Sequence, residues 1–213
     1  LINGEAPGAM ARACADLGIP FVHVSTDYVF DGSGETAWQP QDMVAPVNAY
    51  GRSKLAGEDG VRAASGTFAI LRTSWVVSAH GNNFVKTMLR LGAERDRLTI
   101  VADQIGAPTP ARDIARACLD MARQLRADPG KSGTYHLQGS PEVSWAGLAV
   151  EIFAQTGVDC VVAEIATSAY PTPALRPLNS RLDCTTLNTV FNIPQPDWRL
   201  GLRDILNDLG ELS

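Results

Sequence analysis

Tyr50 and Lys54 are a tyrosine and a lysine four residues apart, a spacing that suits proton transfer to a carbonyl group. On a helix, residues at this spacing lie one above the other on the same face. The phenol would supply a proton, and the nearby ammonium would lower the pKa of the tyrosine from its ordinary value of ~10. The pair alone is weak evidence, because an exposed aromatic residue beside a solvated lysine gives the same spacing.

A short apolar strand is predicted over residues 21–24, and the polar residues 25–27 follow it. Ligands of open α/β sheets bind beyond the carboxyl ends of the strands, where these polar residues would lie. The hydroxyl of Thr26 could hydrogen-bond the same carbonyl oxygen that Tyr50 protonates. A helix cap or turn is the alternative role, and we consider it less suitable because residues 28–30 are apolar and no clear helix follows.

The composition bounds the class of protein. The chain has 213 residues, of which 45% are apolar, and a net charge of −5, which suits one domain or one domain with a small lobe. The negative charge argues against a general nucleic-acid surface. No run approaches the ~20 apolar residues that a membrane span needs.

The cysteines show neither metal-ligand spacing nor a Cys-x-x-Cys pair. Cys14, Cys118, Cys160 and Cys184 are widely spaced, and we interpret all four as reduced packing residues, consistent with a cytoplasmic protein. The three histidines are also scattered, and we interpret His23 and His136 as structural residues rather than metal ligands.

Two stretches, residues 25–32 (STDYVFDG) and 48–58 (NAYGRSKLAGE), closely resemble the dTDP-4-dehydrorhamnose reductase family of extended short-chain dehydrogenases/reductases. Further matching pieces are residues 3–8 (NGEAPG), 71–75 (LRTSW), 81–85 (GNNFV), 103–109 (DQIGAPT) and 176–183 (RPLNSRLD). These pieces occur in the family's order and cover nearly the whole chain, so together they are far more specific than any one of them.

The resemblance implies reduction of the C4 ketone of dTDP-4-dehydro-L-rhamnose by NADPH or NADH, giving dTDP-L-rhamnose in carbohydrate biosynthesis. Tyr50 is then expected to be the general acid, with Lys54 and Thr26 as the other catalytic residues. Val24, Tyr50 and Lys54 are expected at the cofactor, with Lys54 holding the nicotinamide ribose. Val24 read from the sequence alone is a core strand residue.

The substrate contacts implied by the resemblance are Thr26, Asp27 and Trp75. Asp27 would accept a hydrogen bond from a sugar hydroxyl, while Trp75 is equally well explained as a core tryptophan. Arg176 is a candidate partner for the diphosphate because its forked guanidinium suits phosphate, although a surface salt bridge explains it as well. Residues 103–109 would border the substrate or form a simple turn.

Strands that alternate with helices predict a parallel α/β sheet, which the resemblance makes a Rossmann-like sheet. We expect residues 1–137 to form the NAD(P)-binding part and residues 138–213 mainly a smaller substrate-binding lobe, with elements interleaved between the two. The glycine-rich turn that binds the pyrophosphate is absent, because residues 32–34 (GSG) lack the third glycine and precede no helix. The first part of the nucleotide-binding sheet is therefore expected to be missing from this sequence.

Two other functions stay open. A related epimerase or dehydratase is one, although a dehydratase is expected to have Thr-Asp-Glu where residues 26–28 read Thr-Asp-Tyr. A non-catalytic protein similar to the regulatory subunit of methionine adenosyltransferase is the other. We expect a dTDP-sugar as partner and neither nucleic acid nor membrane. A homodimer and Mg²⁺ are suggested only by family members that form metal-assisted dimers, and no metal ligand is expected in this chain.

Overall fold

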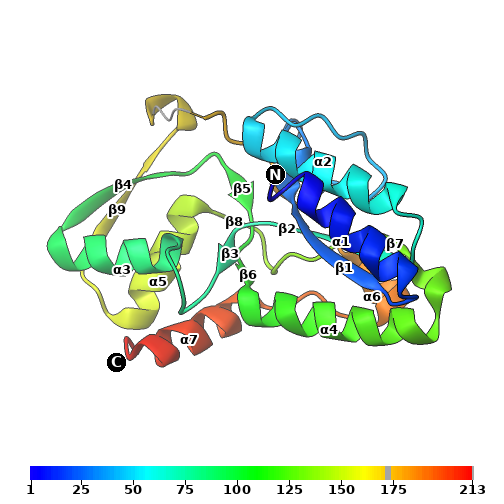
Figure 1. The fold of residues 1–213 in the computed structure, drawn as a ribbon. Helices are drawn as coiled ribbons and strands as arrows, with labels where there is room; N and C mark the ends of the chain where they lie inside the picture. The colour runs from blue at the N-terminus through cyan, green and yellow to red at the C-terminus, as the bar shows by residue number, and fades with distance from the viewer. Residues whose placement is uncertain (171–173, 213) are drawn as a thin grey trace.

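A parallel three-stranded sheet lies at the centre of the larger part of the molecule in a computed structural model, which describes residues 1–170 and 174–212 (Figure 1). Its strands are β1 (Phe21–Thr26), β2 (Phe68–Thr73) and β7 (Gly133–His136), in the order β1-β2-β7. In the register of the sheet, Thr26 lies opposite Thr73. The carboxyl ends of β1 and β2 therefore meet at one edge.

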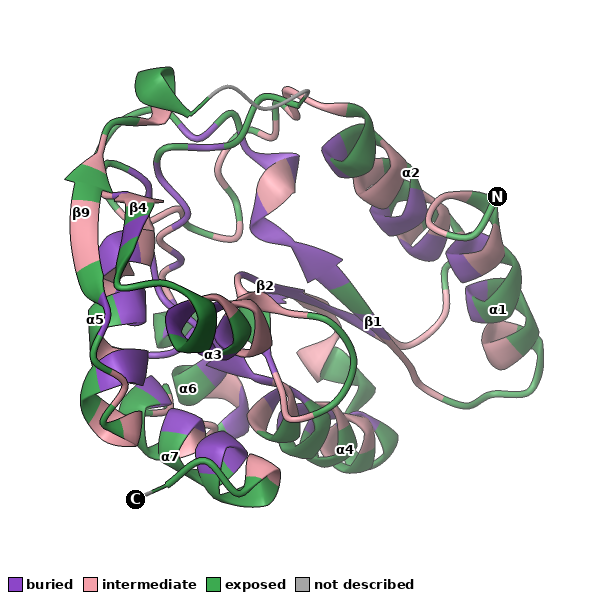
Figure 2. Cartoon of the chain, turned by 90° about the vertical axis from the view of Figure 1, so that its left-hand side faces the viewer, coloured by how far each residue is buried: buried purple, intermediate pink, exposed green. Residues whose placement is uncertain are grey.

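Helices cover both faces of this sheet (Figure 1). Alternate side chains of a strand point to opposite faces. Ile70 accordingly packs with residues of α1 (Glu5–Asp16) and α2 (Ala49–Ala63), while Leu71 packs with residues of α4 (Ala111–Ala127) and α6 (Thr185–Phe191). The outer faces of α1 and α2 carry the exposed residues and their inner faces the buried ones (Figure 2).

A second lobe lies beside the sheet in Figure 1, and its elements pack around an apolar cluster of their own. Its helices are α3 (Phe84–Glu94), α5 (Trp145–Thr156) and α7 (Trp198–Leu209), and its parallel strand pair is β4 (Arg97–Val101) with β9 (Val161–Ile165). The cluster includes Met88 from before position 137 and Leu148 and Leu202 from after it. The lobe is therefore assembled from both halves of the chain.

The remaining elements are short. They are the strands β3 (Val76–Val77), β5 (Ile105–Gly106), β6 (Thr109–Pro110) and β8 (Val143–Ser144) and the 3-10 turns η1 (Asp27–Val29), η2 (Pro129–Lys131) and η3 (Thr167–Ala169). The parallel α/β prediction is confirmed. The sequence reading did not anticipate α6 or these short strands, because two-residue bridges and a seven-residue helix leave little periodicity.

Three smaller expectations can be compared with the structure. All four cysteines are free, as expected. β1 continues through Thr26 instead of ending at residue 24. Among the described residues, no helix has both the length and the apolar character that crossing a membrane requires.

Candidate active site

The start of α2 places Tyr50 beside the end of β1. The side chain of Asn48 caps the helix by accepting a hydrogen bond from the Gly51 amide at 2.9 Å. A Cβ atom at position 51 would collide with the carbonyl oxygen of Tyr28. Glycine is therefore required for the first turn of α2 to rest on the backbone that follows Thr26.

Lys54 reaches from α2 to the backbone of β1. Its Nζ donates a hydrogen bond to the carbonyl oxygen of Val24 at 2.6 Å. The side chain of Val24 is 37% exposed, so the interpretation of Val24 as a core residue is wrong. In the part of the chain that the structure describes, β1 pairs only with β2, so its other edge is unpaired.

Thr26 lies at the junction of the strand and the next turn. Its Oγ1 donates to Oδ1 of Asp27 at 3.0 Å and accepts from the amide of Tyr28 at 3.2 Å. The cap role that the sequence reading disfavoured is therefore present, because η1 is a single turn that the apolar pattern hid. Thr26 also contacts Tyr50, where its hydrogen bond acts to lower the pKa of the phenol.

The pKa of Tyr50 is raised overall, chiefly because burial disfavours the phenolate and further because of the charge of Asp27. This direction is opposite to the one that its pairing with Lys54 predicted. Burial therefore outweighs any effect of Lys54, whose ammonium donates its hydrogen bond to the Val24 carbonyl. Burial also lowers the pKa of Lys54, and the nearby carboxylate of Glu58 opposes that change.

Asp27 is enclosed, with only 3% of its surface exposed. Burial raises its pKa to about 6, while hydrogen bonds with Ser180 and Thr26 act to lower it. Its Oδ2 atom is buried without a hydrogen bond of ordinary geometry to any described residue. This oxygen is enclosed by the protein and keeps unused capacity to accept a hydrogen bond.

Trp75 follows β2 in a left-handed backbone conformation, with φ of 45°. Its ring stacks on Trp145, with centroids 3.7 Å apart, and it packs against the apolar cluster of the second lobe. Gly106 lies against the same ring, where a Cβ would come within 3.2 Å of it. The structure therefore brings the segment of residues 103–109 beside Trp75.

The second lobe contains a cavity of about 650 Å³ next to Trp145. Its lining includes Phe84, Thr87, Met88, Leu91, Arg95, Arg97, Leu98, Thr99, Ile100, Val101, Gln104, Trp145, Tyr170 and Arg176. Trp145 is held by a hydrogen bond from its Nε1 to Oε1 of Gln104 at 3.1 Å. A mostly apolar wall with a few fixed polar groups is typical of a small-molecule site.

Arg176 links this cavity to the end of β1. A hydrogen bond and the charge of Arg176 act to lower the pKa of Tyr28, although burial raises that pKa overall. The ring of Tyr28 packs edge-on against the ring of Tyr50, with centroids 5.6 Å apart. The sequence singled out Arg176 and Tyr50 but gave no reason to connect them through Tyr28.

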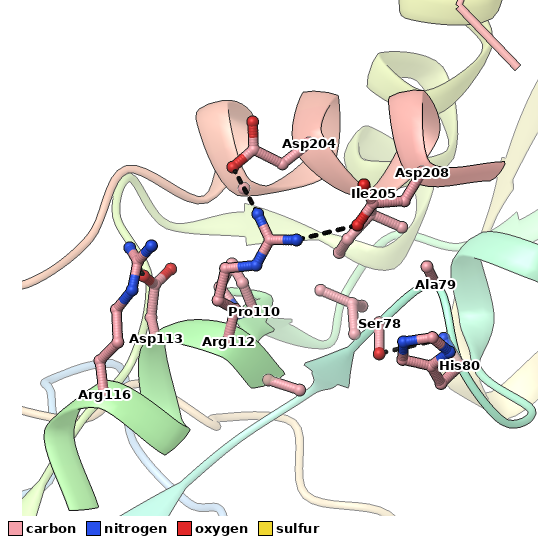
Figure 3. Close-up of a pocket in the computed structure, with 13 residues that line it drawn as sticks. Ser78, Ala79, His80, Pro110, Arg112, Asp113, Arg116, Asp204, Ile205 and Asp208 are labelled. Atoms are coloured by element: carbon pink, nitrogen blue, oxygen red, sulfur yellow. Dashed lines mark hydrogen bonds and ion pairs between the residues drawn. The ribbon is translucent and has the colours of Figure 1, made fainter. Parts of the chain in front are cut away.

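A different cavity, of about 260 Å³, lies between β3, α4 and α7 (Figure 3). Arg112 there pairs with Asp204 at 3.3 Å and with Asp208 at 2.9 Å, and Arg116 pairs with Asp113 at 3.7 Å. None of the predicted site residues lines it. Among the described residues, no group of three or more histidine, cysteine, aspartate or glutamate side chains is arranged to hold a metal ion.

A parallel α/β sheet with threonine at a strand end, beside a helix that presents tyrosine and lysine, defines the short-chain dehydrogenase/reductase class. Within this class, the family model described as the RmlD substrate binding domain matches residues 1–211. The chain belongs to this family of dTDP-4-dehydrorhamnose reductases, and the resemblance inferred from its motifs is confirmed.

Known proteins agree in sequence and in fold. The dTDP-4-dehydrorhamnose reductase of Sinorhizobium fredii is 44% identical over 211 residues, which cover 96% of this chain and 71% of the relative. That of Burkholderia thailandensis is 45% identical over 224 residues, covering 97% and 75%. The crystal structure of a dTDP-4-dehydrorhamnose reductase from Clostridium acetobutylicum superposes with a TM-score of 0.90 at 38% identity, covering 98% of this chain and 72% of that one.

A fourth relative was solved with a bound dinucleotide. The structure of the dTDP-4-dehydrorhamnose reductase from Bacillus anthracis in complex with NADP has a TM-score of 0.87 at 35% identity, covering 97% of this chain and 72% of that one. The similarity extends over nearly all of this chain in every case, so both parts of the fold belong to the shared architecture.

Proposed function

We propose that this chain carries the proton-transfer and substrate-binding parts of an enzyme that reduces the C4 ketone of dTDP-4-dehydro-L-rhamnose with NADPH or NADH. The observation that supports it most is the meeting of Thr26, Tyr50 and Lys54 at the carboxyl end of β1. Its relatives carry the name of this reductase, and one of them binds NADP. The product would be dTDP-L-rhamnose.

The residues around the end of β1 fit a nicotinamide cofactor. Val24 offers an exposed apolar surface, and Lys54 lies beside it with its ammonium at the strand backbone. Lys54 would hold the ribose, and Tyr50 and Val24 would border the ring. The bound cofactor supplies the hydride that reduces the ketone carbon.

Tyr50 is the proposed general acid for the oxygen that becomes negatively charged. Its raised pKa keeps the phenol protonated near neutral pH, and positioned proton transfer of this kind contributes typically 10²–10⁴-fold to a rate. Thr26 would orient the Tyr50 hydroxyl. The Thr26 hydroxyl donates a hydrogen bond to Asp27 in this structure. It could instead donate to the ketone oxygen when the substrate binds.

The proposed substrate site extends from Tyr50 into the cavity of the second lobe. Trp145 and the neighbouring apolar residues would enclose the nucleoside, since the cavity volume of about 650 Å³ lies within the ~300–1,000 Å³ common for ligand pockets. Arg176 would bind the diphosphate through its fork. Trp75 would border the sugar, and Asp27 would accept a hydrogen bond from one of its hydroxyls.

Replacing Tyr50 by phenylalanine in the natural protein tests the general acid. The ring stays and the proton is lost, so ketone-dependent NADPH oxidation should fall by about 10²–10⁴-fold. Tyr135→Phe is the matched control, because its hydroxyl only donates to the backbone of Lys131 at 2.7 Å. Nearly unchanged turnover in Tyr50→Phe would disprove the proposed role.

The same assay separates the other functions. A redox-neutral epimerase would consume no net NADPH, and a regulatory protein would show no turnover with a purified 4-keto sugar nucleotide. We also propose a cytoplasmic location, which the four free thiols support. The expected homodimer and any need for Mg²⁺ are tested by measuring mass in solution and activity with and without a chelator.

A further inference from the structure

Glu58 is a buried carboxylate one helical turn after Lys54. Its side chain is 0% exposed, and its Oε1 accepts a hydrogen bond from Nε of Arg72 at 2.9 Å. Its Oε2 accepts from Nη2 of Arg72 and from Nη2 of Arg62, both at 2.7 Å. Withdrawing a carboxylate from water is costly unless it is paired and hydrogen-bonded, and here both oxygens are satisfied.

Arg72 connects this carboxylate to the sheet and to the long loop after β1. It lies in the middle strand, opposite Ser25 of β1 and His136 of β7, and only 2% of it is exposed. Its Nη1 donates to the carbonyl oxygen of Pro40 at 3.2 Å, and its guanidinium lies 5.0 Å from the ring centroid of Phe30. The fork therefore ties α2 to the strand ends.

We infer that Glu58 and Arg72 are positioning residues of the active site, which hold α2 in the rotation that brings Tyr50 and Lys54 to Thr26 and place a negative charge one turn behind Lys54. The inference rests on the proposed function. Neither residue touches the reacting atoms, so both act through the residues on α2. A bidentate arginine–carboxylate pair suits this task because its geometry is fixed at two atoms.

The charge of Glu58 acts on Lys54, which lies one turn earlier on α2. Burial lowers the pKa of Lys54, and Glu58 opposes this by favouring the ammonium. The titratable groups that face Glu58 are His23 of β1, Lys54 and Arg62 of α2, Arg72 of β2 and His136 of β7. Burial lowers the pKa of the two histidines to about 4 and about 3, so both are neutral near neutral pH.

The test uses Glu58→Gln and the double variant Glu58→Gln/Arg72→Met in the natural protein. The double variant avoids an unpaired buried arginine and should therefore be more thermostable than the single one. Without the carboxylate, Lys54 loses its proton more readily. Both variants should show the alkaline limb of the kcat profile at lower pH and a raised KM for NADPH, with kcat reduced by up to about 10²-fold.

Asp59→Asn is the matched control. Asp59 is the next residue, its side chain is 67% exposed, and it pairs with Arg62 at 3.0 Å. Its replacement should leave the pH profile and both kinetic constants unchanged. A folded double variant with the native pH profile and the native KM for NADPH would overturn the inference, since a merely structural pair would change stability alone.

Glu58→Asp covers the case in which the other variants do not fold. It keeps the charge on a shorter side chain, so the alkaline limb should stay in place while kcat falls. An unchanged kcat in this variant would overturn the positioning role. The proposed function is judged separately by Tyr50→Phe. Native kinetics in all Glu58 variants, combined with an inactive Tyr50→Phe, would disprove only the positioning role of Glu58 and Arg72.

Discussion

The end of β1 and the cavity of the second lobe differ in what surrounds their polar groups. At the end of β1, charged and hydroxyl side chains are almost fully buried and hydrogen-bonded in pairs, Arg72 to Glu58 and Thr26 to Asp27. The cavity is walled by aromatic and aliphatic residues around Trp145, and Arg176 beside it is exposed.

This difference indicates that the two regions have different roles, one in proton transfer and the other in substrate binding. Buried, paired charges fix the geometry of a few atoms, which suits proton transfer. Apolar walls with exposed cations supply area and attraction but tolerate small movements, which suits binding. Substitutions at the end of β1 should therefore lower kcat and weaken cofactor binding. Substitutions at the cavity should raise the KM of the nucleotide sugar.

Lys54→Met should give the largest difference between the two regions. Removing the ammonium that holds the Val24 carbonyl should lower turnover by about 10²-fold or more and weaken NADPH binding. Lys86→Met is the matched control in the lobe, where Nζ donates to the Ala79 carbonyl at 3.4 Å. Turnover and a direct titration of NADPH affinity are the measurements, and unchanged affinity in Lys54→Met would exclude the ribose-binding role.

Asp27→Asn should change how stability depends on pH. The folded-state pKa of about 6 lies above the ordinary value of 3.8, so the contribution of Asp27 is full below the ordinary value and is lost as pH rises toward 6. The variant should abolish this loss, which amounts to about 3 kcal/mol at most.

The free energy of unfolding is measured with denaturant at acid and at neutral pH for the variant and the parent. The buried histidines change stability with pH in the opposite direction, and their contribution cancels because both proteins contain them. Asp31→Asn is the control, because that carboxylate is exposed and its pKa is lowered by hydrogen bonds from Ser33. An Asp27→Asn variant whose stability changes with pH as the parent's does would contradict the raised pKa.

Gly51→Ala and Gly147→Ala compare the tolerance of the two regions. A Cβ at position 51 would meet the backbone of Tyr28, which cannot move without displacing η1, whereas one at position 147 would meet only the tip of Val143. Gly51→Ala should cost about 2–3 kcal/mol of stability and reduce kcat. Gly147→Ala should be near neutral. Equal thermal shifts in the two variants would show that the first turn of α2 is less constrained than the contacts indicate.

Trp145→Ala should give the smallest effect and the one most confined to binding. Removing the ring that stacks on Trp75 should raise the KM of the nucleotide sugar by about tenfold, because such aromatic contacts contribute about 0.5–1.5 kcal/mol. The KM of NADPH should stay nearly constant. A variant in which both KM values rise equally would show that the cavity and the end of β1 are not separable.

The order and type of most elements could be predicted from the sequence. The apolar strands and the amphipathic helices are continuous stretches with a clear period, as in α4, where the buried residues Ile114, Met121 and Leu125 recur at helical spacing. The turn η1 and the seven-residue helix α6 could not be predicted in this way, because such short elements show little periodicity and depend on tertiary contacts. Val24 was misjudged as a core residue because exposure depends on what lies beside a strand.

The site was predictable only as far as its residue types and spacings. Tyr50 and Lys54 share a helix and residues 25–27 follow a strand, which are local features, and the α/β class places the strand end at the ligand side of the sheet. The roles of Tyr28, Glu58 and Trp145 arise from packing between segments distant in sequence. Nothing in their local pattern distinguishes them from ordinary core or surface residues.

The sequence by itself determined the parallel α/β class, the family and the pairing of Tyr50 with Lys54. Periodicity and motif spacing are local properties that can be read directly from the order of the residues. Only the tertiary structure decided that Lys54 holds the strand backbone and that the pKa of Tyr50 is raised. Burial and the direction of a hydrogen bond are set by neighbours brought from elsewhere in the chain, and these determine the protonation of a side chain.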